Sequence, residues 1–302
     1  MATTPIISFQ SGPQVTVNDW IKTPYRVPRY TLDLMQQGFL VDAVLRTEGA
    51  CPSGVVLYNE SSPLYGGNVI EDRPEFGEIP VGQFGLGTPK AAYSRDKSIG
   101  VVISEEMHDR NNVDMMMLGM EQTSNDMTKT WDDLFINIAL ANAGVQTFTA
   151  ASHWNTSGYD VRSDWASIMK LIEGAQDPQG SELGYICDTV ILSRTSKYDI
   201  IRSKDFNDDV KYGNVASENL RYTGKLPNQI MGLDVLVSPR VPAGKAIFMA
   251  RRTAGFISDE KPLFSTPLKY DEDRPGWRCN IRRKAAIGID QPKAMVVASN
   301  VS

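Results

Sequence analysis

The feature that most constrains this chain is a long run of helical periodicity near its middle. After Asn111 or Asn112, either of which is a good N-cap, apolar or small residues recur every three or four positions until Gly144 ends the run. The recurring positions are Val113, Met117, Met120, Ser124, Met127, Trp131, Leu134 and Ile138. The pattern predicts a helix of roughly 30 residues, about 45 Å long at about 1.5 Å per residue. Such a length is typical of a structural spine, and we interpret its methionines as core packing rather than as a metal or partner site.

The segment before this helix, 51–104, is dense in glycine and proline. Two apolar runs, at 55–57 and 99–103, flank the stretch GGNVIEDRPEFGEIPVGQFGLGTP. The pattern predicts an extended two-stranded excursion with a loose tip. Because a two-stranded ribbon is marginal in water without a third strand or a covering helix, we expect something outside the subunit's own core to hold it.

The first 28 residues carry four prolines, Pro5, Pro13, Pro24 and Pro28, among short apolar pairs. Prolines remove backbone donors and bias the preceding residue to extended shapes, so this stretch is predicted to be an arm rather than a domain. The alternative is a disordered tail. The arm is too apolar to live in water, so we expect it to lie on another surface. Its apolar residues are Ile6, Ile7, Phe9, Val15, Val17, Trp20 and Ile21.

Two shorter amphipathic helices are also predicted, one between the arm and the segment at 51–104 and one after the long helix. From Arg29, one helical face carries Leu34, Gly38, Val41 and Leu45, and Gly49 could end that helix. The other helix lies C-terminal to the long one, and we expect it to lie beside the long helix. It has Ser163 as its cap, Gly174 at its end, and the apolar face Trp165, Ile168, Met169 and Ile172.

The rest of the C-terminal half is predicted to alternate strands with one short helix. The run at 189–192 indicates a buried strand, and SRTSKYDIIRSKDF indicates a cap followed by a short helix. The stretch MGLDVLVSPRVPAGKAIF, at 231–248, predicts a β-hairpin whose turn is stiffened by Pro239, Pro242 and Gly244. Strand-like runs follow at 256–257, 277–281 and 295–297.

Composition excludes several classes of function. No run is apolar for long enough to cross a membrane, and the N-terminus lacks the order of a signal peptide. The formal net charge of −5 argues against a protein that holds nucleic acid by neutralising phosphates. The three cysteines, Cys51, Cys187 and Cys279, are far apart and predict buried thiols rather than disulfides or a zinc site.

No pattern in the sequence indicates catalysis. The two histidines, His108 and His153, have no cysteine or second histidine at ligand spacing. The run GQFGLGTP lacks the strand, helix and lysine of a nucleotide loop, and the acidic pairs are adjacent rather than facing. No catalytic residue, metal or cofactor is therefore predicted. The basic run RCNIRRK, at 278–284, could bind phosphate or could be an exposed strand face that meets neighbouring carboxylates.

The order of these elements resembles that of the major capsid proteins of tailed bacteriophages, which have the Hong Kong 97-like fold. The resemblance covers nearly the whole chain and includes DKSIGVVISEEM, VILSRTSKYDIIRSKD, GLDVLVSPRVPAGKAIFMA, YDEDRPGW and QPKAMVVA. It implies an α+β fold with four parts. These are an N-terminal arm and short helix at 1–50, an E-loop at 51–104, a P domain at 105–176 and 257–288, and an A domain at 177–256 and 289–302.

The resemblance also implies a function. The chain would be a major head protein that assembles as hexamers and pentamers into an icosahedral shell around double-stranded DNA, without binding a specific sequence. It would be assembled in the bacterial cytoplasm, with a portal, a separate scaffolding protein and a decoration protein as candidate partners and no membrane. The candidate assembly contacts are Phe9, Trp20, Ile21, Arg73, Phe76, Phe84, Lys97, Arg282 and Arg283.

Two alternatives are an encapsulin, which is a protein shell of the same fold enclosing enzymes, and a soluble α+β enzyme. Encapsulins tend to begin at their first helix, whereas here a long proline-rich arm comes first. The enzyme reading lacks any convergent polar cluster.

Two departures from the family pattern have consequences. The chain has no room for the N-terminal scaffolding segment that some members cleave, which is why the scaffolding protein is expected to be separate or absent. Some members also link an E-loop lysine to an asparagine in the P-domain turn. Here that turn holds Gly276, so Lys90 and Lys97 lack an obvious partner, although Asn280 is close in sequence.

Overall fold

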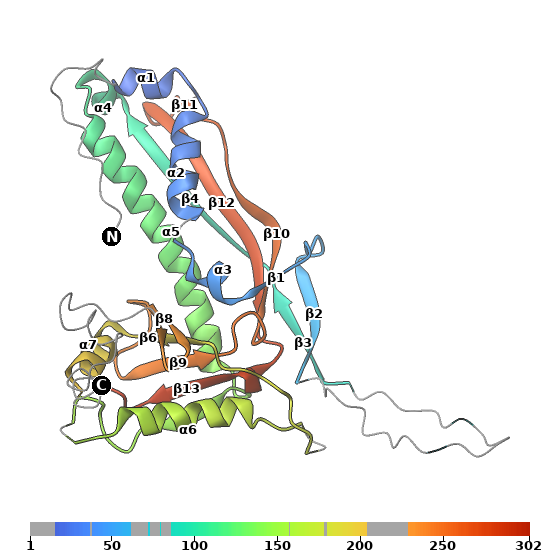
Figure 1. Ribbon diagram of the computed structural model, residues 1–302. Helices are drawn as coiled ribbons and strands as arrows, with labels where there is room; N and C mark the ends of the chain where they lie inside the picture. The colour runs from blue at the N-terminus through green and yellow to red at the C-terminus, as the bar shows by residue number, and fades with distance from the viewer. Residues whose placement is uncertain are drawn as a thin grey trace. The chain divides into compact units, whose positions relative to one another are not determined.

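The computed structural model confirms the mixed helix and strand content that the sequence predicts (Figure 1). The described residues are 16–36, 38–61, 72, 79, 86–156, 158–177, 180–203 and 229–302. The chain divides into two compact units. Unit 1 comprises Met1–Phe39, Asp96–Thr130 and Lys261–Lys284, and unit 2 comprises Leu40–Arg95, Trp131–Glu260 and Ala285–Ser302. The boundaries of these two units differ from those expected for the arm, the E-loop, the P domain and the A domain. The division into those four parts remains a prediction.

The long helix is confirmed as α5, Val113–Ala141. Asn112 is its N-cap, since the Asn112 side chain accepts a hydrogen bond of 3.2 Å from the backbone N–H of Met115. Met116, Met120 and Met127 are buried, which confirms that methionines of this helix pack in the core. The buried face differs from the predicted one at both ends. Met116 rather than Met117 begins it, and Phe135, Ile136 and Ala139 are buried where Leu134 and Ile138 were expected.

The segment that precedes the first predicted helix is partly helical, which corrects the expectation of an extended arm. Helix α1 is Val17–Ile21, and Thr16 and Asp19 form a capping box at its start. Helix α2 is Arg26–Gln36, and Pro28 lies in its first turn, where a missing N–H costs nothing. Local capping chemistry thus outweighs the extended bias of the prolines after residue 16.

The single helix expected from Arg29 to Gly49 is wrong. The chain instead forms α2, then α3 at Leu40–Val44, then β1 at Arg46–Glu48. The helix breaks around Gly38, a residue that an uninterrupted helix disfavours. A new helix then starts where the Asp132 side chain accepts a 3.1 Å hydrogen bond from the N–H of Leu40.

A five-stranded sheet has the order β1-β10-β12-β11, with β4 also paired to β12. Two predicted runs are confirmed as strands and prove longer than their apolar residues suggested: β10 is Phe256–Ser265 and β12 is Gly276–Gly288. The other members are β4 at Arg95–Ser104 and β11 at Lys269–Asp271. Helix α4, Glu105–Asp109, follows β4 directly and is capped by Ser104.

The two-stranded excursion is present, but its return strand comes earlier than predicted. Strand β2, Val55–Glu60, pairs antiparallel with β3, Thr88–Tyr93, whereas the apolar run at 99–103 belongs to β4. The sequence TPKAAY of β3 has few large apolar residues, so periodicity gave no signal there. The residues 62–71, 73–78 and 80–85 between the strands lie outside the described residues.

The base of this ribbon is held by the chain's own core, contrary to expectation. Ala92 is buried in a cluster with Cys51, Phe256 and Ala286, and Tyr58 meets Phe256 edge to face at 5.2 Å between ring centroids. A neighbouring subunit is therefore not needed to order the base.

Unit 2 contains a six-stranded sheet with the order β5-β13-β9-β6-β8-β7. The predicted buried strand is confirmed as β6, Thr189–Leu192, and all four of its residues are buried. Helix α7, Arg194–Arg202, follows it with Ser193 as N-cap, as predicted. The remaining strands are β5 at Gln146–Thr149, β7 at Gln229–Ile230, β8 at Leu233–Val237, β9 at Lys245–Met249 and β13 at Met295–Ser299.

The hairpin predicted at 231–248 is wrong. Strands β8 and β9 do form there, but β6 lies between them, parallel to β8 and antiparallel to β9. The hairpin in this region is instead formed by β7 and β8, joined by Met231 and Gly232. Both turn residues have positive φ, 51° and 82°, as a two-residue type I′ turn requires.

Helix α6, Val161–Glu173, covers one face of this sheet rather than lying beside the long helix as expected. Its fully buried residues Val161, Trp165, Ile168 and Ile172 pack with Phe248 of β9 and with other apolar residues of the sheet. Its N-cap is Asp160 rather than Ser163, because the Asp160 carboxylate accepts the N–H of Ser163 at 3.0 Å. Gly174 ends it, as predicted, and the short 3-10 helix η1, Pro292–Ala294, precedes β13.

Candidate functional site

The basic run RCNIRRK lies on β12 and alternates as a half-buried strand should. Arg278, Asn280 and Arg282 point away from the core, whereas Cys279, Ile281 and Arg283 are buried. Arg278 is thus exposed and Arg282 half-buried on the outer side of the strand, but no described carboxylate forms an ion pair with either, so their expected contact with neighbouring carboxylates stays a prediction.

Arg283 has the opposite orientation, which corrects its place among the candidate contacts. Its side chain is only 4% exposed, and its guanidinium carbon lies 5.2 Å from the centroid of the Phe39 ring. A buried guanidinium that packs on its own chain is not available to a neighbour.

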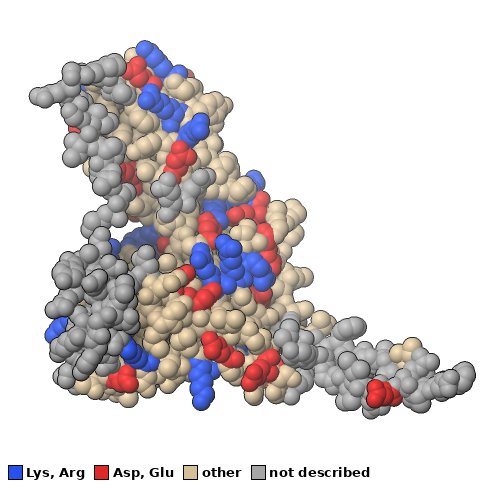
Figure 2. Space-filling view, viewed as in Figure 1, with Lys and Arg blue, Asp and Glu red and all other residues tan. Residues whose placement is uncertain are grey.

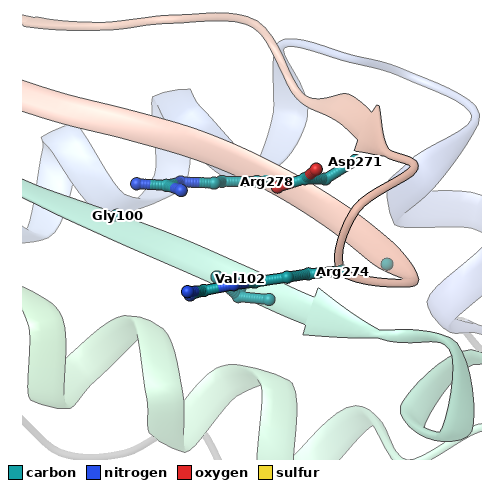
Figure 3. Close-up of a pocket in the computed structure, with 6 residues that line it drawn as sticks. Gly100, Val102, Asp271, Arg274 and Arg278 are labelled. Carbon is teal, nitrogen blue, oxygen red and sulfur yellow. The ribbon is translucent and has the colours of Figure 1, made fainter.

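A shallow hollow lies in the face of unit 1 where β4 and β12 pair. It has a volume of about 150 Å³ and is lined by residues of β4, β12 and the turn before β12 (Figure 3). The lining residues are Gly100, Val102, Asp271, Arg274, Gly276 and Arg278. Figure 3 shows the side chains of Arg274 and Arg278 extending the same way, with their guanidinium groups on the side away from Asp271.

A second hollow of about 210 Å³ continues this face and shares Gly100 and Arg278 with the first. Its other lining residues are Ser98, Ile99, Asn280 and Arg282. Three arginines, at 274, 278 and 282, therefore lie along one continuous surface, which we call the arginine row.

Two glycines keep this surface open and its strands close. A Cβ on Gly100 would lie 3.1 Å from Oδ1 of Asn280 and 3.2 Å from Nε of Arg278, so a side chain there would push the Arg278 head away. Gly276 has φ of 152°, and its Cβ would lie 2.6 Å from the carbonyl oxygen of Ile103. The glycine in the turn is thus required by close backbone approach.

Hydrogen bonding fixes Arg278 but leaves the row without anionic partners. The Arg278 Nε donates to Oδ1 of Asn280 at 2.9 Å. Among the described residues, no carboxylate pairs with Arg274, Arg278 or Arg282. The Nε of Arg282 is buried and has no hydrogen-bond partner in the part of the chain that the structure describes.

An acidic tip lies at the same end of unit 1. The turn between β11 and β12 exposes Glu272 and Asp273, and helix α4 exposes Glu105 and Glu106. The Tyr270 hydroxyl donates to the Glu105 carboxylate at 3.0 Å, and this hydrogen bond raises the pKa of Tyr270. The ring of Trp277 packs on those of Tyr270 and His108, which joins the turn to the helix.

The other candidate assembly contacts do not gather at the arginine row. Trp20 is 8% exposed and stacks edge-on against Tyr30 at 5.5 Å, so it packs within unit 1, while Ile21 is half-buried. Lys97 is half-buried on β4, and Lys90 forms an ion pair with Glu60. Four further candidates, Phe9, Arg73, Phe76 and Phe84, lie outside the described residues.

The described residues offer little for catalysis. No group of three metal-ligating side chains comes together in them. Burial raises the pKa of Cys187 to about 12 and that of Cys279 to about 11, so these thiols stay protonated and unreactive. Among the helices that the structure describes, none is both long and apolar enough to cross a membrane.

Charge is mixed rather than segregated on the face shown in Figure 2. Lys and Arg side chains gather next to Asp and Glu side chains there, without a broad field of one sign. A surface of mixed charge is better matched to a protein partner of mixed charge than to nucleic acid, which calls for a broad basic surface.

Sequence reasoning missed Gly100, Arg274 and the acidic turn as parts of one site. The sequence DEDR at 271–274 does place three acidic residues next to an arginine. Gly100 could not be assigned to the site from the sequence, because only the pairing of β4 with β12 brings it next to Arg278.

Comparison with known proteins gives a family match and several matches of fold. The model of a family described as phage capsid protein matches residues 91–298. No protein in the curated collection matches the chain. The capsid structure of the cyanophage P-SCSP1u is 11% identical, with a TM-score of 0.62, and the match covers 99% of this chain and 92% of that one.

Two other solved structures are similar over most of their length. A phage-related protein from Bordetella bronchiseptica is 11% identical, with a TM-score of 0.61, over 95% of this chain and 98% of that one. A virus-like particle from Pyrococcus furiosus is 11% identical, with a TM-score of 0.57, over 91% and 98%. At these identities the structures establish the fold, which is the Hong Kong 97-like fold.

Proposed function

The chain belongs to the phage capsid protein family, and we propose from this that it is a major head protein, which builds the icosahedral shell around a phage genome. The family match over 91–298 carries the proposal, because it includes the long helix, most of the six-stranded sheet and the arginine row. The fold supports it through similarity along nearly the whole chain.

The chemistry of the described residues supports a structural rather than an enzymatic role. Arg274 and Arg278 are exposed cations without an ion-pair partner among the described residues, and Glu272 and Asp273 are exposed carboxylates without one. Such groups stabilise contacts between molecules more readily than they turn over a substrate.

The proposed partners are other copies of the chain, arranged as hexamers and pentamers. The E-loop at 51–104, whose ribbon base is anchored by Tyr58 and Ala92, would extend over an adjacent subunit. A portal, a separate scaffolding protein and a decoration protein complete the proposed set. The enclosed double-stranded DNA would be held without sequence-specific binding, in line with the net charge of −5. The mature protein would be located in the virion capsid, which would be assembled in the bacterial cytoplasm.

A second candidate is a shell that encloses protein. The observation that favours it is the similarity in fold to the virus-like particle from Pyrococcus furiosus. The family match favours the phage head over this alternative.

Electron microscopy of the purified protein tests the proposal. We expect closed shells large enough for a phage genome, because the chain has the fold and the family match of a capsid subunit. Small shells filled with protein would favour the second candidate. The absence of shells at every protein and salt concentration, with a folded subunit, would overturn both.

Mature particles are expected to contain no covalent cross-link between subunits. An isopeptide bond needs a lysine amine delivered to an asparagine amide, with a carboxylate nearby in a dry site. The expected asparagine position holds Gly276, whose backbone contact with Ile103 leaves no space for a side chain, and Lys90 is paired with Glu60. Denaturing electrophoresis under reducing conditions should give one band near 33.4 kDa. A ladder of larger bands would contradict this and would point to Asn280 as the acceptor.

A further inference from the structure

We propose that the arginine row of one copy binds the acidic turn of a second copy, with Arg274, Arg278 and Arg282 facing Glu272 and Asp273. This inference rests on the proposed function, since it names one contact by which the shell subunits would recognise each other. It rests on charged side chains that have no ion-pair partner within the described residues, cations on one side of the contact and carboxylates on the other.

The cationic side is a built surface rather than a random group of side chains. Arg278 is fixed by its 2.9 Å hydrogen bond to Asn280, and Gly100 beneath it leaves the space that its head occupies. The hollows of about 150 and 210 Å³ are each large enough to admit a carboxylate beside an arginine. The guanidinium carbon of Arg282 lies 5.7 Å from the centroid of the Phe264 ring, which holds the side chain in place, and no described carboxylate forms an ion pair with it.

The anionic side is equally unpaired. Glu272 and Asp273 are exposed in the turn before β12, and no described cation forms an ion pair with either. Glu106 and Asp109 of α4 differ from them, because they already face Arg110 and His108. Glu272 and Asp273 are therefore the carboxylates of this tip that are free to pair with a second copy.

The two sides do not neutralise each other within one copy. Among the described residues no ion pair joins Arg274, Arg278 or Arg282 to Glu272 or Asp273. Figure 3 shows the guanidinium groups of Arg274 and Arg278 on the side away from Asp271, the last residue of β11, which directly precedes the acidic turn. A surface that carries both halves of a contact, displaced from each other, is complementary to a second copy in a head-to-tail arrangement. Repeated head-to-tail contacts form rings when the rotation between copies closes, and a shell built of hexamers and pentamers requires such rings.

Charge reversal tests the inference without assuming which arginine meets which acid. The first variant carries Arg278→Glu and Arg282→Glu, the second carries Glu272→Arg and Asp273→Arg, and the third combines all four. We expect each of the first two to raise the protein concentration for half-maximal assembly at least about tenfold, and the third to return it to near the wild-type value. Light scattering during assembly, with electron microscopy of the products, measures this.

A matched control changes the same amount of charge elsewhere on unit 1. Arg29 of α2 and Lys129 of α5 are both exposed, so the variant Arg29→Glu with Lys129→Glu should assemble as the wild type does. Thermal melting of each unassembled variant checks folding. If a reversal unfolds the subunit, Arg278→Gln with Arg282→Gln removes the cations with less repulsion and is expected to weaken assembly several-fold.

The other outcomes overturn the inference in distinguishable ways. A defect in the arginine variant alone would mean that the row binds another anion, such as the acid-rich stretch at 71–78 of a second copy or a nucleic acid. Normal assembly of both reversals, or a combined variant that stays defective while folded, would remove the contact but leave the proposed function standing. Failure of the wild-type protein to form shells would overturn the proposed function and this inference together.

Discussion

Replacing Trp165 with alanine is expected to lower the free energy of unfolding by about 3–5 kcal/mol, which is a large part of the stability of an ordinary domain. Trp165 has no exposed surface and lies at the centre of the contact between α6 and the six-stranded sheet. Its ring meets Phe248 edge to face at 5.3 Å and lies 6.1 Å from the ring of Trp154. Alanine would leave a cavity that the surrounding strands, buried on both faces, have little freedom to fill.

Two further variants separate packing from other effects of the substitution. The indole N–H of Trp165 has no hydrogen-bond partner among the described residues, so Trp165→Phe removes volume without breaking a hydrogen bond and should cost less than alanine. Leu171 lies on the same helix and is 39% exposed, so Leu171→Ala should cost below about 1 kcal/mol. Urea unfolding followed by near-ultraviolet circular dichroism measures all three. A loss from Trp165→Ala as small as that from Leu171→Ala would show that this core is not closely packed.

The sequence predicted the elements whose signals are local. Helix α5 carries its own cap, Asn112, and a periodic apolar face, so its start and approximate length follow from the residues themselves. Strand β6 is a short apolar run followed by a capped helix, and both were found where predicted. These features need no knowledge of what packs against them.

The errors arose where pairing is non-local. Strands β8 and β9 are each apolar and are joined by a short turn, which favours a hairpin if only the sequence is considered. In the fold, β6 comes from far earlier in the chain and inserts between them, because it can pair with one in parallel and with the other antiparallel. No local pattern shows which strand occupies the middle of a sheet.

The candidate site divides in the same way. The alternation of RCNIRRK on a strand was predictable, and in the structure it turns Arg278 and Arg282 away from the core. The same alternation puts Arg283 in the core, which a list of basic residues does not show. The part played by Gly100 depends on the pairing of β4 with β12, and that pairing became visible only with the fold.

The stability of unit 2 is expected to fall as pH rises from about 4 to about 7, because of one buried carboxyl group. Asp132 is 7% exposed, and burial raises its pKa to about 7, with the nearby Asp133 and Asp42 adding to the rise. Hydrogen bonds from the backbone N–H groups of Val41 and Leu40 oppose the shift but do not outweigh burial.

The sign of the effect follows from proton binding. An unfolded aspartate loses its proton near pH 4, whereas the folded Asp132 keeps its proton up to about pH 7. Between these values the folded state binds more protons than the unfolded state, so each unit of rising pH removes at most about 1.4 kcal/mol of stability. The stabilisation is fully present below the unfolded pKa and is lost as pH rises through the folded one.

Asp132→Asn should remove this dependence. The amide stays neutral at every pH, and its oxygen can still accept the N–H of Leu40 at the start of α3, so the two proteins should be about equally stable near pH 4. At pH 8 the variant should be more stable than the wild type by up to about 4 kcal/mol, the full span of the titration. Asp126→Asn, an exposed position on the same helix, is the control for loss of one negative charge and should leave the slope unchanged. Urea unfolding of the unassembled subunit across this pH range decides the matter, and parallel curves for the wild type and Asp132→Asn would show that Asp132 is ionised in the folded protein.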